Sequence, residues 1–210
     1  MSNGQKAPAF GTRWADVASL GVEDEMLVEA VFRGEVARDS VSQFAPRTRG
    51  GFDAWSERVE AVREFLVPPL GWRSAEPYNY PTVISPCGRI AIGFAAGDAA
   101  TGDISALPMT KRSVGPATLY ALSAQLSLFD SSVRGGGTGP LTWLLLTNRI
   151  NDEVVRAEIS LPKTIDEASR VVGWQYRHIL GSFDLTMPPS GGGLEAPEPP
   201  VQSEVLVDPL

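Results

Sequence analysis

The segment from residue 141 to residue 161 places the strongest constraint on the fold. Apolar and polar residues alternate over residues 154–161, with the two-residue period of a β-strand that buries one face. Residues 141–147 are apolar at nearly every position, which favours a central strand covered on both faces. Asn151 and Asp152 predict a turn between the two strands. The segment therefore predicts a β-hairpin whose second strand directs Val155, Ala157, Ile159 and Leu161 into the core and Arg156, Glu158 and Ser160 toward solvent.

A second hairpin is predicted earlier in the chain. Residues 82–85 and 89–94 flank a turn-forming run at residues 86–88. Pro86 suits the second position of a tight turn and Gly88 suits the fourth. In the strand that follows, Ile90, Ile92 and Phe94 alternate onto one face.

Two helices are predicted before the hairpins. Apolar residues recur at three- and four-residue spacing between residues 22 and 34, and Gly34 suits the end of that helix. Asp53 suits the N-cap of the second helix, and the pair Pro68-Pro69 predicts its end. Residues 46–51, between the two helices, predict an exposed loop.

Further helices are predicted in the second half of the chain. Residues 116–129 predict a helix between the two hairpins, with leucines along one side. Thr164 and Glu167 match the capping-box pattern, which predicts a helix running toward Gly173. Residues 174–180 fit either a continuation of that helix or a final strand.

These elements together predict an α+β fold. N-terminal helices are followed by an antiparallel sheet that contains two hairpins and has flanking helices. Residues 13–187 supply one domain, and residues 1–12 predict a flexible arm. Residues 188–210 are rich in Pro, Gly, Ser and Glu, so a disordered tail is expected there.

The composition narrows the classes of function. The formal net charge of −7 opposes the phosphate neutralisation on which nucleic-acid binding depends, so direct nucleic-acid binding is not expected. Cys87 and His178 are the only residues of their types, so one chain forms neither a disulfide nor a zinc site of Cys and His ligands. No cofactor is predicted. A cytoplasmic location is expected, because no apolar signal core follows the N-terminal residues and no stretch reaches the roughly 18 apolar residues of a membrane span.

The pentapeptide at residues 125–129, Gln-Leu-Ser-Leu-Phe, carries the one specific motif. It resembles the segment by which bacterial polymerases, repair proteins and clamp loaders bind the replicative sliding clamp. The resemblance implies that Gln125 enters a small polar subsite and that Leu128 and Phe129 enter an apolar cleft, with Leu126 and Ser127 as spacers. The predicted partner-binding residues are thus Gln125, Leu126, Leu128 and Phe129.

The motif predicts a non-catalytic protein-interaction domain linked to DNA replication, repair or mobile elements. Residues 104–162 also resemble uncharacterised proteins of high-GC bacteria and their mobile elements, a resemblance that implies no activity. The alternative interpretation of residues 126–129 is that their apolar side chains simply complete a core helix.

Two other functions are compatible with the sequence. The first is an acidic inhibitor that resembles DNA in its charge and binds a basic partner. The second is a Mg²⁺-dependent nuclease, in which Asp98 or Asp103 and Glu158 gather around the metal ion. Such sites normally have a lysine two residues after the glutamate, and here that position is Ser160.

Overall fold

A computed structural model describes residues 14–129 and 139–187, and for residues 123–129 it describes the helical backbone only. The predicted arm at residues 1–12 and the predicted tail at residues 188–210 lie outside the described residues. Among the described helices, none is long and apolar enough to cross a membrane. In chain order the elements are α1 (Trp14–Ala18), α2 (Asp24–Asp39), α3 (Arg49–Leu70), β1 (Arg73–Ala75), the 3-10 helix η1 (Pro77–Asn79), β2 (Thr82–Ile84), β3 (Ile90–Ala96), α4 (Pro116–Phe129), β4 (Leu141–Arg149), β5 (Val154–Ile165) and β6 (Val171–Asp184).

The six strands form one sheet in the order β1-β2-β3-β4-β5-β6, so neighbours in the chain are neighbours in the sheet. All pairs are antiparallel except β3 and β4, which run parallel. The α+β class is confirmed, whereas the expectation of a wholly antiparallel sheet is wrong at this one pair. Parallel neighbours need a crossover connection, and the crossover here contains α4.

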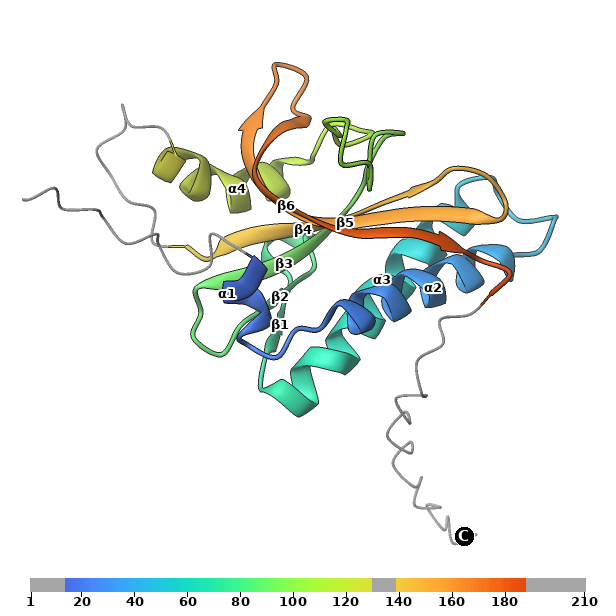
Figure 1. The fold of residues 1–210 in the computed structure, drawn as a ribbon, viewed down its shortest axis with the longest axis horizontal. Helices are drawn as coiled ribbons and strands as arrows, with labels where there is room; N and C mark the ends of the chain where they lie inside the picture. The colour runs from blue at the N-terminus through green and yellow to red at the C-terminus, as the bar shows by residue number, and fades with distance from the viewer. Residues whose placement is uncertain (1–13, 130–138, 188–210) are drawn as a thin grey trace, which may run out of the picture.

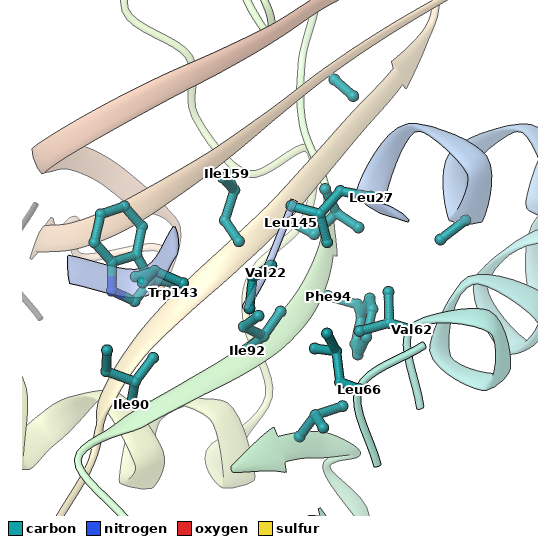
Figure 2. Close-up of a cluster of buried hydrophobic side chains, with 14 of the residues drawn as sticks. Val22, Leu27, Val62, Leu66, Ile90, Ile92, Phe94, Trp143, Leu145 and Ile159 are labelled. Carbon is teal, nitrogen blue, oxygen red and sulfur yellow. The ribbon is translucent and has the colours of Figure 1, made fainter. Parts of the chain in front are cut away.

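The helices cover the two faces of the sheet, with α1, α2 and α3 on one face and α4 on the other (Figure 1). The larger core lies between the sheet and α1–α3, where the side chains of both layers point toward each other (Figure 2). Trp143 and Leu145 of β4 enter this core, whereas Leu144 and Leu146 enter the smaller core beneath α4. The strand β4 is therefore covered on both faces, as its apolar sequence predicts.

Both predicted hairpins are present, with strand boundaries that differ from the prediction by up to four residues. In the β4–β5 hairpin, Asn151 Oδ1 accepts hydrogen bonds from the amides of Glu153 and Val154, which closes the turn. In the β2–β3 hairpin, the amide of Gly88 donates to the carbonyl of Ser85 at 2.9 Å, and Gly88 has a φ of 69°. The alternating residues predicted for the core are buried in both hairpins: Ile90, Ile92, Phe94, Val155, Ala157, Ile159 and Leu161.

The helix predicted from Thr164 to Gly173 is wrong. Ile165 ends β5 and pairs with Val171 at the start of β6. Asp166 forms the turn between them, because its carboxylate accepts hydrogen bonds from the amide and the Nε of Arg170. The capping-box pattern is local, and the pairing of a long strand against β5 satisfies more backbone groups than a short helix would. Residues 174–180 accordingly belong to the strand β6.

Gly34 lies inside α2 and does not end it. A Cβ at this position would lie 2.6 Å from Cγ of Arg58 and 2.7 Å from the carbonyl oxygen of Ala54, both on α3. The absence of a side chain thus allows the two helices to approach closely. Beside this contact, Arg58 Nη1 lies 2.9 Å from Oε1 of Glu35, and both side chains are buried.

The boundaries of α3 also differ from the prediction. The helix begins at Arg49, inside the predicted loop, and Asp53 forms an ion pair with Arg49 instead of capping the helix. At the other end the helix continues through Pro68 and Pro69 to Leu70, and Gly71 follows in the left-handed conformation. A proline removes a hydrogen bond inside a helix, and this cost is smallest in a terminal turn that Gly71 already closes.

Candidate functional site

Residues 97–110 form a loop that covers part of the sheet face on which α4 lies. The loop begins and ends with paired backbone, because Gly97 and Thr110 form an isolated antiparallel bridge. Gly97 donates to the carbonyl of Thr147 on β4, and Thr110 donates to the carbonyl of Val171 on β6, each at 3.0 Å. The loop is therefore attached at both ends to the sheet that it covers (Figure 1).

Glu158 is the centre of the contacts beneath this loop. Its side chain is fully buried, although the alternation of β5 predicts a solvated face. One carboxylate oxygen, Oε1, accepts hydrogen bonds from the hydroxyl of Ser160 and from Nε of Arg177. The other, Oε2, accepts from the amide of Gly102 in the loop and from Nη2 of Arg177. Four donors thus saturate a carboxylate that the loop removes from water.

Arg177, on β6, holds the same loop by donating to two of its backbone carbonyls. Its Nη1 donates to the carbonyl of Ala106 at 2.6 Å, and its Nη2 donates to the carbonyl of Asp103 at 3.0 Å. The planar guanidinium suits this task, because its five donors point in fixed directions. Trp174, three residues earlier on β6, adds a bond from its indole Nε1 to the carbonyl of Pro108 at 2.8 Å.

The two aspartates of the loop also form local contacts. The Oδ1 of Asp98 accepts from the amide of Ala100. The Oδ1 of Asp103 accepts from both the amide and the hydroxyl of Ser105, at 2.8 and 2.6 Å. The hydroxyl of Ser105, followed by its amide, holds the pKa of Asp103 below the usual aspartate value, because both donors favour the charged carboxylate. The three carboxylates therefore hold the loop in shape.

The predicted magnesium site is not assembled by this geometry. The oxygens of Glu158 already accept from Arg177, Ser160 and Gly102, so they present no free lone pairs toward Asp98 or Asp103. Within residues 14–129 and 139–187, no three His, Cys, Asp or Glu side chains are grouped so that they could hold a metal ion. The nuclease hypothesis gains no support from the arrangement of these residues.

The loop instead presents two aliphatic side chains to solvent. Ile104 is 87% exposed and Leu107 is 75% exposed. Ile104 lies between the anchored residues Asp103 and Ala106, and Leu107 is flanked by two anchored carbonyls, that of Ala106 and that of the residue after Leu107, which accepts from Trp174. Loops attached to a rigid scaffold are common positions for binding residues. Two exposed aliphatic side chains on a loop that is fixed from below are the features of a preorganised docking site.

The pentapeptide at residues 125–129 forms the C-terminal end of α4. The helix packs on the sheet through the buried side chain of Leu122, which lies in one cluster with Leu144 and Leu146 of β4. The side chains of the five residues themselves lie outside the described part of the structure, so the choice between clamp binding and core packing stays open. The backbone places the predicted motif at the end of a helix, next to residues 130–138.

The side chains of Cys87 and His178 each form a hydrogen bond with a nearby residue. The Sγ of Cys87 lies 3.3 Å from the hydroxyl of Ser85, and this hydrogen bond lowers the pKa of the exposed thiol. The Nε2 of His178 lies 2.8 Å from Oδ2 of Asp24, and its ring stacks on Trp14 with 4.6 Å between centroids. His178 therefore fastens the start of α2 and the short helix α1 to β6.

Several acidic residues of the helical layer form ion pairs with arginines. Arg33 on α2 forms ion pairs with Glu57 and Glu64 on α3, and Arg149 on β4 forms one with Asp39 at 2.7 Å. These pairs neutralise part of the negative charge on the helical layer. The acidic-inhibitor alternative is consequently not strengthened by this face of the molecule.

The residues that build this site were only partly predictable. Glu158, Asp98 and Asp103 are singled out by the sequence for a metal, whereas Arg177 is not, because residues 174–180 fit two kinds of element. In the strand that forms, Arg177 lies opposite Ser160, and this register is set by the pairing of β5 with β6. The exposure of Ile104 and Leu107 has no comparable sequence signal.

Comparisons of the chain with models of known protein families, with curated proteins and with solved structures found no significant match. The fold and the anchored loop define an α+β domain with a candidate docking site.

Proposed function

We propose that this chain is a non-catalytic protein-interaction domain that docks through the loop at residues 97–110. The observation that carries the proposal is the exposure of Ile104 and Leu107 on a loop that the buried pair Glu158–Arg177 holds in place. The buried carboxylate of Glu158 holds the loop in position, and each of its two oxygens already accepts two hydrogen bonds.

The energetics favour binding by such a loop. Full burial of one Ile or Leu side chain contributes about 1.5–3 kcal/mol, so Ile104 and Leu107 supply enough for a central apolar contact. Binding to a mobile loop costs conformational entropy when the loop becomes ordered. Here the hydrogen bonds of Arg177 and Glu158 already order the loop in the folded protein, so binding requires little further loss of conformational entropy.

Site-specific photo-crosslinking in the source cells tests this proposal. A crosslinker at Ser105 is expected to capture one protein, and the capture is lost in the variant Ile104→Asp/Leu107→Asp. Thermal unfolding of that variant should match the wild type, because both side chains are already in water. A crosslinker at Glu60, an exposed position on α3, serves as the control. Capture of the same proteins from both positions, or capture that survives the double substitution, would contradict the proposal.

The partner that we propose is the replicative sliding clamp, which would link the domain to DNA replication, repair or mobile elements. Support comes from the match of residues 125–129 to the clamp-binding pentapeptide and from its place at the end of α4. The residues assigned to the clamp cleft are Leu128 and Phe129, with Gln125 as the polar anchor. The loop and the pentapeptide both belong to the connection between β3 and β4, so one partner could contact both.

The alternative of an acidic inhibitor differs from this proposal in one measurable respect. Binding by contiguous carboxylates weakens steeply as salt increases, because the charges are screened over about 8–10 Å at physiological ionic strength. Binding by Ile104, Leu107 and the pentapeptide is expected to respond weakly to salt. A salt titration of the captured complex therefore separates the two.

A further inference from the structure

The end of α2, the start of α3 and the connection between them carry a second group of exposed apolar side chains. Val36 is 64% exposed, Phe44 is 90% exposed and Phe52 is 58% exposed. Phe52 also contacts the half-buried ring of Trp55, with 5.7 Å between the ring centroids. The helices α2 and α3 form a helical hairpin, and we call residues 36–55, where the two helices are joined, the hairpin tip. Exposed aromatic rings in one short region indicate a surface that another segment covers.

The described chain leaves the sheet beside this hairpin tip. Phe183, near the end of β6, contacts Phe32 of α2 with 6.1 Å between ring centroids. The amide of Leu185 then donates to the carbonyl of Glu153 in the β4–β5 turn at 2.7 Å. Figure 1 shows the end of β6 next to the second half of α2. The last described residues therefore lie beside the end of α2, where the hairpin tip begins.

Arg149 fixes this arrangement. It donates to the carbonyl of Asp152 in the same turn at 2.9 Å, and it forms an ion pair with Asp39 in the last turn of α2 at 2.7 Å. Its guanidinium also reaches the buried Glu35 at 3.3 Å. Arg149 thus holds the β4–β5 turn against the end of α2, and the backbone bond from Leu185 attaches the end of β6 to the same turn.

The segment after this exit point has the chemistry to cover the tip. Residues 203–207 read Ser-Glu-Val-Leu-Val, which combines three adjacent aliphatic side chains with one carboxylate. The 15 residues from 188 to 202 precede it, and they can span at most about 50 Å when extended. That reach exceeds what is needed, since the exit point and the hairpin tip both adjoin the end of α2.

The exposed arginines of the hairpin tip are complementary in charge to the acidic side chains of residues 188–210. Arg47 and Arg49 at the hairpin tip are both exposed. Arg49 pairs with Asp53, whereas Arg47 pairs with no carboxylate in the described part of the chain. Residues 188–210 contain four acidic and no basic side chains, and two of the four, Glu204 and Asp208, lie in or next to residues 203–207.

We propose that residues 203–207 of this chain dock on the hairpin tip of the same molecule, with Val205 and Leu206 against Phe44 and Phe52 and with Glu204 near Arg47. The site takes a short aliphatic peptide that carries negative charge. A partner that uses the hairpin tip would have to displace the chain's own segment, which makes the docking a form of intramolecular competition. This surface is separate from the loop at residues 97–110, so each proposal is tested independently.

Paramagnetic relaxation in the full-length chain tests the docking. A nitroxide is attached at Gln202→Cys in a Cys87→Ser background, and the amide signals of residues 36–55 are recorded. Docking predicts loss of signal intensity at these residues and little loss at residues on α4. The variant Val205→Asp/Leu206→Asp, with the same label, should restore the signals. The variant Phe44→Ser, at a fully solvated position, should restore them without a change in thermal unfolding.

A mixed sample distinguishes docking within one molecule from docking between two molecules. It combines nitroxide-labelled chains without isotope enrichment and isotope-enriched chains without a nitroxide. Contact within one molecule predicts no broadening in the enriched chains of the mixture. Broadening there would show that a second copy supplies the segment, and the proposal of docking within one molecule would be overturned. Unchanged signals at residues 36–55 in the labelled wild-type chain would also overturn it.

Discussion

Glu158 and Arg177 form a two-point ion pair across neighbouring strands, with Nε–Oε1 at 3.0 Å and Nη2–Oε2 at 2.6 Å. The glutamate is fully buried, and the arginine is nearly so, because the loop at residues 97–110 lies over both. The pair supports the loop by accepting from Gly102 and by donating to Asp103 and Ala106. A single buried contact thus determines the shape of the surface above it.

Loss of one partner of this pair is expected to be costly. Arg177→Met leaves Glu158 buried without its cation, which should lower the free energy of unfolding by about 3–5 kcal/mol. The double variant Glu158→Gln/Arg177→Met should lose less than the sum of the two single variants, since no charge then remains buried. Urea unfolding measures all three.

The ion pair between Arg170 and Asp166 provides the matched control. The Arg170 side chain is 40% exposed, so Arg170→Met should cost only about 0–1 kcal/mol. An Arg177→Met variant as stable as Arg170→Met would show that the buried pair does not hold the loop.

Two glycines on neighbouring helices are expected to respond oppositely to alanine. At Gly34 a Cβ would lie 2.7 Å from the backbone oxygen of Ala54, which cannot move without shifting α3. Gly34→Ala should therefore destabilise the protein by about 1–3 kcal/mol. At Gly51 nothing lies within 4 Å, so Gly51→Ala should stabilise the helix by up to about 1 kcal/mol. Thermal and urea unfolding of both variants check the sign of each change.

Ser105 is expected to control the ionisation of Asp103. The depressed pKa of Asp103 contributes stability above the ordinary aspartate pKa, and that contribution is lost as the pH falls through the lower folded value. Ser105→Ala removes the hydroxyl donor, so the pKa of Asp103 should rise toward its ordinary value. A carbon-detected NMR titration of the carboxyl groups measures this shift. Asp184, whose pKa is lowered by Thr186 in the same way, should not change.

The clamp-binding hypothesis predicts a separation of binding from stability. Leu128→Ala/Phe129→Ala should abolish binding to purified sliding clamp, because both apolar anchors of the motif are lost. The unfolding midpoint should stay close to that of the wild type. If the double variant instead melts well below the wild type, the alternative interpretation holds, in which these side chains complete a core helix. Gln125→Ala, which removes only the polar anchor, should weaken binding without affecting the fold.

The hairpins could be predicted because their signals are local. Residues such as Val155 and Ile159 alternate with polar neighbours, and Asn151 and Gly88 supply the turn conformations. The covered position of β4 also follows from its own sequence, since Leu144 and Leu145 enter opposite cores.

The remaining features depend on contacts between distant segments. Gly34 suits a helix end as well as a close helix contact, and only the position of Ala54 decides between the two. Glu158 follows the alternation of a solvated face, and only the loop that carries Gly102 removes it from water. The capping pattern at Thr164 is equally local, and the pairing of β6 against β5 overrides it.

The parallel pairing of β3 with β4 requires a long crossover, and this crossover carries exposed side chains that take no part in the pairing of the strands. Both strands keep their partners on their other sides, β2 and β5, whatever the connection contains. That connection carries Ile104, Leu107 and residues 125–129, which are all the side chains assigned here to an outside partner. Exchange of only the exposed side chains of this connection between related chains would change what the domain recognises, while the contacts that fix the connection to Glu158 and Arg177 stay as they are.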